Sequence, residues 1–314
     1  MSTQKICVLG GSGFVGSHII NMLSNADKTV VVASRRQAHC AHLSVLPNVT
    51  VIVADIYNQN KLDALSKGCD AMINLVGILN EHGHNGDGFR QAHIELPRKV
   101  LTACHNNNIP RLLHMSALNA DASNSPSRYL RTKGEGENHV HAFAGKLKVS
   151  SFRPSVIFGR EDLFFNRFAS LLKTTPWFFP LACPNSRFAP VYVNDVARCF
   201  VNALNDKSSY GQRYNLCGPK EYTLKQLVQY TSEVSGLKHK IIGLPHFISK
   251  IQAGLLEWWP GKPFSIDNFR SLQVDSTCQH GTPQSTSLES VVPYYLGSQQ
   301  LRSKQDQYRQ QASR

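Results

Sequence analysis

The sequence of 314 residues lacks several features that would place it in a specialised class. No run of 18 or more apolar residues occurs, which excludes a conventional transmembrane helix. There is no Cys-x-x-Cys pair, and no third ligand accompanies His82 and His84, so we expect no metal site. Residues 1–5 leave no room for a signal peptide. We therefore expect a cytoplasmic protein, or one whose presequence is missing from this chain.

The net charge indicates which class of partner the protein binds, and the cysteines indicate the redox state of the compartment in which it occurs. Lys and Arg number 34 against 21 Asp and Glu, giving a net charge of +13, which favours an anionic partner. The basic residues are scattered and not interleaved with aromatics on a helix, so we expect no nucleic-acid binding. The eight cysteines are dispersed, and we expect reduced, buried thiols and no disulfide.

Short apolar runs alternate with helical patterns through the first half of the sequence. Such hydrophobic strands, separated by amphipathic helices, are typical of a parallel sheet covered on both faces. Right-handed crossovers then favour an α/β fold with a doubly wound Rossmann sheet. The expected strands are 6–9, 29–33, 49–54, 71–77, 111–116 and 148–152, and the expected helices are 15–24, 61–66, 94–106 and 129–143.

Beyond residue 160 this alternation stops, which indicates a second portion of the chain. We expect a first domain over residues 1–160, to which 187–217 return, and a smaller, mostly helical portion over 161–186 and 218–298. Residues 299–314 are polar and form a tail. The elements expected after residue 160 are a helix from about 164, an aromatic turn at 177–180, strands at 189–193 and 212–216, and helices at 196–203 (capped by Asn194 and Asp195) and 224–234.

A glycine-rich segment, residues 10–16, follows the first strand and opens the first helix. Its Gly10, Gly13 and Gly16 have a spacing that allows a tight turn and the close approach of a pyrophosphate. The helix N-terminus offers free N–H groups and a positive dipole to phosphate oxygens. The position inside a βαβ unit predicts a dinucleotide site. The residues expected to form it are Gly10, Ser12, Gly13, Phe14, Val15 and Gly16.

The end of the second strand distinguishes between the two nicotinamide dinucleotides. NAD sites usually place an acidic residue there to bind the ribose 2′-hydroxyl. This sequence has no carboxylate at that point and has Arg35 and Arg36. Guanidinium groups suit a 2′-phosphate, so we expect NADP(H) to be preferred over NAD(H). Further expected cofactor contacts are Asp55 and Ile56 after the third strand and Val76 and Gly77 at the end of the fourth.

Tyr129 and Lys133 form a Tyr-x-x-x-Lys pattern at the start of a predicted helix. Residues four apart share a helix face, so the ammonium is expected to lower the pKa of the phenol and to hold ribose hydroxyls. The phenol then exchanges a proton with the substrate. Ser116, at the end of the fifth strand, is the expected hydrogen-bond donor to a substrate carbonyl.

Five segments together resemble the atypical branch of the short-chain dehydrogenases/reductases, which includes NAD-dependent epimerases and dehydratases. Within it, the chain is similar to the nucleotide-binding accessory subunit of respiratory complex I and its bacterial relatives. The resemblance implies a bound NADPH, a largely structural role in the complex, and a place for Pro154 and Val156 beside the nicotinamide half. The segments are residues 10–16, 74–79, 127–133, 153–162 and 190–196.

Two functional hypotheses remain open. One is an active reductase, epimerase or dehydratase acting on a small carbonyl, quinone-like or sugar-nucleotide substrate, with Tyr129 as acid and base. The other is a non-catalytic nucleotide-binding accessory or assembly subunit whose partner is a protein complex. Tyr129 and Lys133 favour the enzyme. Only 12 residues separate Ser116 from Tyr129, fewer than in typical extended dehydrogenases, and this favours the second hypothesis.

Residues 245–259 have apolar positions at helical spacing and end in Trp258 and Trp259. One interpretation is an interfacial helix that rests on a membrane or a partner. The other is a helix that packs over the substrate cleft. Under the first interpretation, we expect the protein to make peripheral contact with the inner face of a membrane.

Overall fold

The computed structural model describes residues 4–36, 40–81, 83, 85–145, 147–175, 177–259, 262–278 and 283–297. The chain divides into two compact units. The first consists of Met1–Pro154 and Val193–Leu216, and the second of Ser155–Tyr192 and Cys217–Arg314. Across the described parts of the chain, no helix is both long enough and apolar enough to span a membrane.

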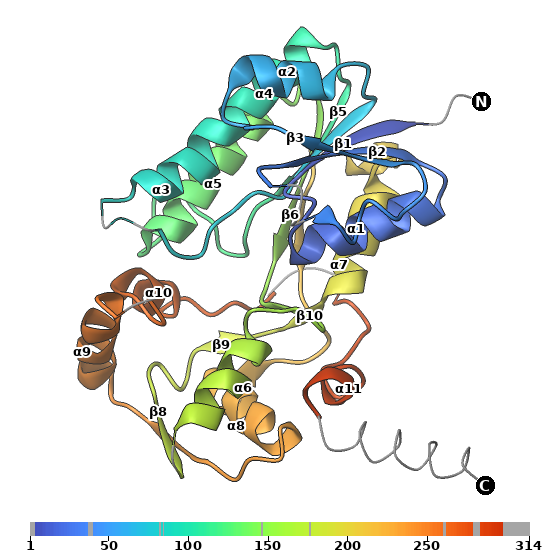
Figure 1. Ribbon diagram of the computed structural model, residues 1–314. Helices are drawn as coiled ribbons and strands as arrows, with labels where there is room; N and C mark the ends of the chain where they lie inside the picture. The colour runs from blue at the N-terminus through green and yellow to red at the C-terminus, as the bar shows by residue number, and fades with distance from the viewer. Residues whose placement is uncertain are drawn as a thin grey trace, which may run out of the picture. The chain divides into compact units, whose positions relative to one another are not determined.

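A seven-stranded sheet forms the centre of the first unit, in the order β11-β6-β5-β4-β1-β2-β3 (Figure 1). Every neighbouring pair of strands is parallel. The chain moves outward from β1 to β3 and then returns to the other side of β1, so the direction of winding switches between β1 and β4. Ligands of such sheets bind at this switch point, beyond the carboxyl ends of the strands. The strands are β1 (Lys5–Leu9), β2 (Thr29–Ser34), β3 (Val49–Val53), β4 (Ala71–Asn74), β5 (Arg111–Met115), β6 (Lys148–Pro154) and β11 (Arg213–Leu216).

Helices cover both faces of this sheet (Figure 1). Helix α1 (Phe14–Asn25) packs beside α7 (Val193–Ala203) on one face, because Ile19, Ile20 and Leu23 of α1 are buried. The other face carries α2 (Gln59–Ser66), α3 (Asp87–Arg90), α4 (Leu96–Asn106) and α5 (Arg128–Ala142). A π-helix (Gln91–Glu95) joins α3 to α4, and a short 3-10 helix (Lys207–Ser209) precedes β11. These layers confirm the expected doubly wound Rossmann fold.

The second unit has its own apolar core, in which α6 and α8 pack together around Phe158, Phe165 and Leu227. Three small two-stranded sheets pair β7 with β10, β9 with β12 and β8 with β13. The strands are β7 (Ile157–Phe158), β8 (Phe178–Leu181), β9 (Arg187–Phe188), β10 (Val191–Tyr192), β12 (Tyr222–Thr223) and β13 (Lys240–Gly243). The helices are α6 (Phe165–Thr174), α8 (Leu224–Val234), α9 (His246–Glu257), α10 (Ile266–Ser271) and α11 (Val292–Leu296).

A disulfide in the second unit corrects the expectation that all cysteines are reduced. Cys217 and Cys278 are bonded although 61 positions separate them, because the fold brings their Cα atoms to 6.0 Å. The other six cysteines are free thiols, and four of them are buried. The wide spacing of the cysteines in the sequence therefore did not mean that they are far apart in the fold.

Several element boundaries after residue 154 differ from those expected. Helix α7 begins at Val193, so Asn194 and Asp195 lie in its first turn and do not precede it as caps. The expected aromatic turn at 177–180 is largely strand β8, which pairs in parallel with β13. These short strands exist because each one hydrogen-bonds to a segment that is distant in the sequence. Local sequence patterns do not reveal such pairing.

Candidate active site in the first unit

The glycine turn stands at the switch point of the sheet. Gly10 follows β1 with a φ of +77°, a left-handed conformation that glycine adopts without strain. A Cβ atom at Gly10 would lie 3.2 Å from the backbone nitrogen of Val76. The end of β1 and the segment after β4 therefore approach backbone to backbone, which brings the predicted residues Gly10 and Val76 together.

Two further glycines allow α1 to begin directly on this turn. A Cβ atom at Gly16 would come 2.5 Å from the Gly10 carbonyl oxygen, and one at Gly13 would come 3.3 Å from the same atom. Gly13 is the N-cap of α1, and no side chain caps the first turn. The helix start also carries no acidic residue. This open, uncapped N-terminus fits a bound pyrophosphate, since its N–H groups and dipole favour an anion.

Arg35 and Arg36 follow β2, and both side chains are exposed. The buried Ser34 shapes the turn, because its hydroxyl bonds both the backbone nitrogen and the carbonyl oxygen of Arg36. Asp55 is exposed after β3, and its carboxylate accepts the backbone N–H of Tyr57. Ile56 packs against the core of the unit. Asp55 thus organises its own loop.

Tyr129 and Lys133 lie in the first turns of α5, which Ser127 caps by accepting the backbone N–H of Leu130. The Tyr129 ring makes edge contacts with His93, at 5.5 Å between centroids, and with Phe89, at 6.3 Å. Burial raises the pKa of Tyr129 to about 12. The direction is opposite to the expected lowering by Lys133, because removal from solvent disfavours the charged phenolate.

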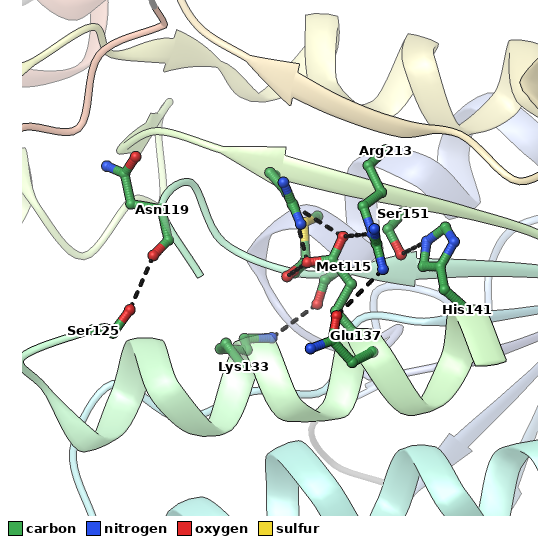
Figure 2. A network of polar contacts seen from close by, with 11 residues as sticks. Met115, Asn119, Ser125, Lys133, Glu137, His141, Ser151 and Arg213 are labelled. Carbon is green, nitrogen blue, oxygen red and sulfur yellow. Dashed lines mark hydrogen bonds and ion pairs between the residues drawn. The ribbon is translucent and has the colours of Figure 1, made fainter. Parts of the chain in front are cut away.

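The Lys133 ammonium is buried where β4, β5 and α5 meet. It donates a hydrogen bond of 2.8 Å to the Met115 carbonyl oxygen (Figure 2). A Cβ atom at Gly77 would lie 3.1 Å from Lys133 Nζ, so the lack of a side chain there admits the ammonium. Burial lowers the pKa of Lys133 to about 8, while the charge of Glu137 opposes this shift.

His93 is a site residue that the sequence analysis missed. Its Nε2 accepts the backbone N–H of Ile78 at 3.1 Å, so the proton resides on Nδ1, which donates to Thr132 Oγ1 at 2.9 Å. Burial, with the charge of Lys133, lowers the pKa of His93 to about 2. A neutral histidine therefore links the segment after β4 to α5, and its place in a π-helix is a common mark of functional sites.

A buried ion-pair network surrounds Glu137, one helical turn beyond Lys133. Arg153 Nε lies 2.9 Å from each carboxylate oxygen of Glu137. Arg213 Nε lies 3.4 Å from one of these oxygens (Figure 2). Two arginines compensate a carboxylate that has no solvent exposure. Ser116 donates its hydroxyl hydrogen to the same carboxylate at 2.8 Å. Contact of this hydrogen with a substrate carbonyl would require that bond to break.

Two glycines after Lys133 allow α5 to approach this site closely. A Cβ atom at Gly136 would come 1.8 Å from the His93 carbonyl oxygen, and one at Gly134 would come 2.6 Å from the backbone nitrogen of Ala122. Side chains at these positions would therefore displace the helix that carries Tyr129 and Lys133. Glycines within a predicted helix are the sequence signal that could have revealed this contact.

The structure does not bring all the predicted residues into one unit. Pro154 ends β6 in the first unit, whereas Val156 belongs to the second, where it packs against that unit's core. His82 and His84 lie outside the described residues. Among the residues that are described, no three histidine, cysteine or acidic side chains are grouped to hold a metal ion.

The sequence model described as the NAD dependent epimerase/dehydratase family matches residues 6–217, from the first strand to the end of β11. The chain belongs to this family. The matched region contains the glycine turn, Tyr129, Lys133 and His93. Membership in an NAD-dependent family agrees with the dinucleotide site that the glycine turn indicates.

Relatives of this epimerase/dehydratase family member include both a respiratory subunit and a reductase. Mouse mitochondrial NADH dehydrogenase (ubiquinone) 1 alpha subcomplex subunit 9 is 29% identical over 83% of this chain and 67% of its own length. The ceramide reductase of Caulobacter vibrioides is 25% identical over 93% of this chain and 90% of its own length. The UDP-glucuronic acid 4-epimerase of Bacillus cereus has the same fold, with a TM-score of 0.71 at 20% identity, covering 94% and 99% of the two chains.

Proposed function

We propose that the chain is an NADP(H)-dependent reductase of a small carbonyl substrate, with Tyr129 as the acid and base. The observation that carries the proposal is that Lys133 and His93 both approach Gly77 after β4, while Tyr129, on the same helix as Lys133, contacts the His93 ring. A phenol and an ammonium on one helix face, beside an open glycine turn, form the arrangement that hydride chemistry requires.

The nicotinamide ring, when bound, supplies or accepts the hydride. The glycine turn and the N-terminus of α1 would hold the pyrophosphate, and Lys133 would hold ribose hydroxyls with the N–H bonds not used by Met115. Tyr129 would donate the proton to the substrate oxygen. Neutral His93 fixes the segment after β4 against α5.

Arg35 and Arg36 support NADP(H) over NAD(H) within this proposal. Both guanidinium groups are exposed directly after β2, and no acidic residue occupies that position. Their positive charges suit a 2′-phosphate. They cannot accept a hydrogen bond from a free 2′-hydroxyl, as the carboxylate usual in NAD sites does.

Reduction of a carbonyl is favoured over epimerisation by the ceramide reductase relative, which matches this chain over most of both lengths. The first substrates to try are therefore hydrophobic ketones, including sphingoid ketones, followed by quinones and nucleotide sugars. Oxidation of NADPH, measured by loss of absorbance, is the assay. The expected result is turnover with at least one member of the first group.

Replacement of Tyr129 by Phe tests the assigned chemistry. Loss of the phenol removes general acid catalysis, which contributes about 10²–10⁴-fold, so kcat should fall by that factor. The Kd for NADPH should stay within about twofold, because the phenol is not assigned to cofactor binding. Retained turnover in Tyr129→Phe would contradict the role of Tyr129.

A second candidate function is a non-catalytic, nucleotide-binding subunit of a respiratory complex. The mouse relative supports it, and so does the engagement of Ser116 by Glu137, which leaves no free serine hydroxyl at the end of β5. In this case NADPH raises the melting temperature without being consumed, and excess ligand at 100 times Kd adds about 2.7 kcal/mol to the free energy of unfolding. Co-purification with a respiratory complex would favour this candidate.

A further inference from the structure

Helix α9 in the second unit exposes its apolar face. Phe247, Leu255 and Trp258 are 72%, 70% and 80% exposed, whereas the buried positions of the helix are the small residues Ser249 and Ala253. At about 100° of rotation per residue, the exposed apolar side chains of the helix itself fall within an arc of about 100°, roughly opposite the buried pair, and the exposed Trp258 and Trp259 directly follow its last turn. These side chains are Phe247, Ile248, Ile251, Leu255, Trp258 and Trp259.

The neighbouring strand pair contributes further exposed apolar side chains. Gln252 of α9 donates to the Pro180 carbonyl oxygen at 3.2 Å, which ties the helix to β8. Trp177 and Phe178, at the start of β8, and Ile242, in β13, are exposed by 87%, 52% and 42%. We refer to these three residues and the six of α9 and the turn directly after it as the apolar surface.

All three tryptophans of the sequence, at positions 177, 258 and 259, belong to the apolar surface. Indole rings with this exposure are costly in water and are favoured where an apolar phase meets a polar one. All three are exposed and all belong to the second unit, which indicates an interface in that unit.

Lysines accompany the apolar surface. Lys250 is exposed on α9, and Lys240 is exposed in β13, where the strand register places it opposite Phe178. Lys173 and Lys238, also exposed, lie within four positions of Trp177 and Ile242. The carboxylate of Glu257 accepts the backbone N–H of Ile266 at 3.3 Å and so turns toward α10. The charges near the exposed face therefore favour an anionic partner.

We propose that the apolar surface binds to an anionic lipid bilayer, with α9 lying in the plane of the interface. Apolar side chains enter the headgroup region, the tryptophans sit at its boundary, and the lysines pair with lipid phosphates. A second copy of the chain is a poorer occupant, because each molecule carries a net charge of +13 and the two would repel. The proposal concerns the second unit and does not depend on the proposed reductase activity.

Vesicle binding by the full chain, without nucleotide, tests this proposal. The probes are phosphatidylcholine vesicles with and without 30% phosphatidylglycerol, at low salt. We expect pelleting with the anionic vesicles and a blue shift of the intrinsic tryptophan emission, since the three tryptophans are all on the apolar surface. Binding should weaken as salt is added.

Variants separate the apolar and the electrostatic contributions. Phe247→Ser with Leu255→Ser should weaken vesicle binding at least tenfold, and Lys240→Gln with Lys250→Gln should weaken it by roughly fivefold for each lysine. Tyr294→Ser is the matched control, because Tyr294 is 71% exposed in the same unit but outside the apolar surface. All three variants should keep the circular dichroism spectrum and the cooperative thermal unfolding of the parent protein, which confirms folding.

Three outcomes would overturn the proposal. The first is no binding to either kind of vesicle. The second is that Tyr294→Ser weakens vesicle binding as much as the variants of the apolar surface do. The third is a blue shift that depends on protein concentration alone, which would identify a second copy of the chain as the occupant. A missing reductase activity would leave the vesicle result unaffected, so failure of the proposed function and failure of this inference are distinguishable.

Discussion

At the scale of single residues, hydrogen-bond partners decide what the candidate side chains do. Ser116 stands at the end of β5, where the sequence places it, but its hydroxyl is directed to a buried carboxylate. His93 carried no motif, yet it bonds two segments and contacts the Tyr129 ring. The sequence can give the position of a polar residue along a strand or helix. The partner of its side chain depends on which elements pack together.

Substitution of Arg35 and Arg36 by Ala tests the assigned cofactor preference. If the proposed preference holds, NADPH should bind the parent protein at least tenfold more tightly than NADH, because the guanidinium groups would pair with a 2′-phosphate that NADH lacks. The double variant should lose most of this difference, while its affinity for NADH stays the same. Fluorescence titration with both nucleotides measures the two constants.

Arg160→Ala is the control for this experiment, since Arg160 is also exposed but lies in the second unit. It should leave the ratio of the two affinities unchanged. Equal binding of NADPH and NADH by the parent protein would refute the assignment.

At the scale of elements, regular patterns were sufficient for the first unit and insufficient for the second. Apolar runs located the six strands from β1 to β6, because each contains several apolar residues, and all but the edge strand β3 are mostly buried. Strands β7, β9, β10 and β12 have two residues each and exist only through their partners, so no periodicity marks them. The π-helix before α4 packs against α5, and Gly136 permits their close approach.

Gly136→Ala should destabilise the protein, although alanine normally favours a helix. The intrinsic gain is about 1 kcal/mol. The new Cβ atom would overlap the His93 carbonyl oxygen, and overpacking of this kind costs typically 1–3 kcal/mol, with more expected against backbone. We expect a net loss in the free energy of unfolding and reduced NADPH affinity, measured by urea unfolding and titration.

Gly145→Ala is the matched control, because a Cβ atom there would meet nothing within 4 Å. It should leave stability and NADPH affinity nearly unchanged. A Gly136→Ala protein as stable as the parent would show that α5 and the π-helix do not need their close contact.

At the scale of the whole molecule, buried neutral histidines predict sensitivity to acid. Burial lowers the pKa of His93 to about 2 and that of His114 well below 6.5. Below pH 6.5 the unfolded chain therefore binds more protons than the folded one, so stability falls as pH falls. Each histidine contributes a slope of roughly 1.4 kcal/mol per pH unit between pH 6.5 and its folded pKa.

Urea unfolding at pH 7 and pH 5 measures this slope. His114→Gln should reduce it by roughly 1.4 kcal/mol per pH unit. The pKa of Lys133, lowered to about 8, acts in a different range: stability should rise between pH 8 and about 10.5, where only the unfolded chain keeps that proton. An identical pH dependence in the parent and in His114→Gln would contradict the argument.

The bond between Cys217 and Cys278 closes the segment between these two cysteines of the second unit into a covalent ring. A protease that cuts once inside this ring, for example in the exposed turn after α9, would produce two fragments that still migrate together on a denaturing gel. They would part only after reduction. Limited digestion, with and without a thiol, therefore shows directly whether the crosslink is formed in the protein isolated from its cell.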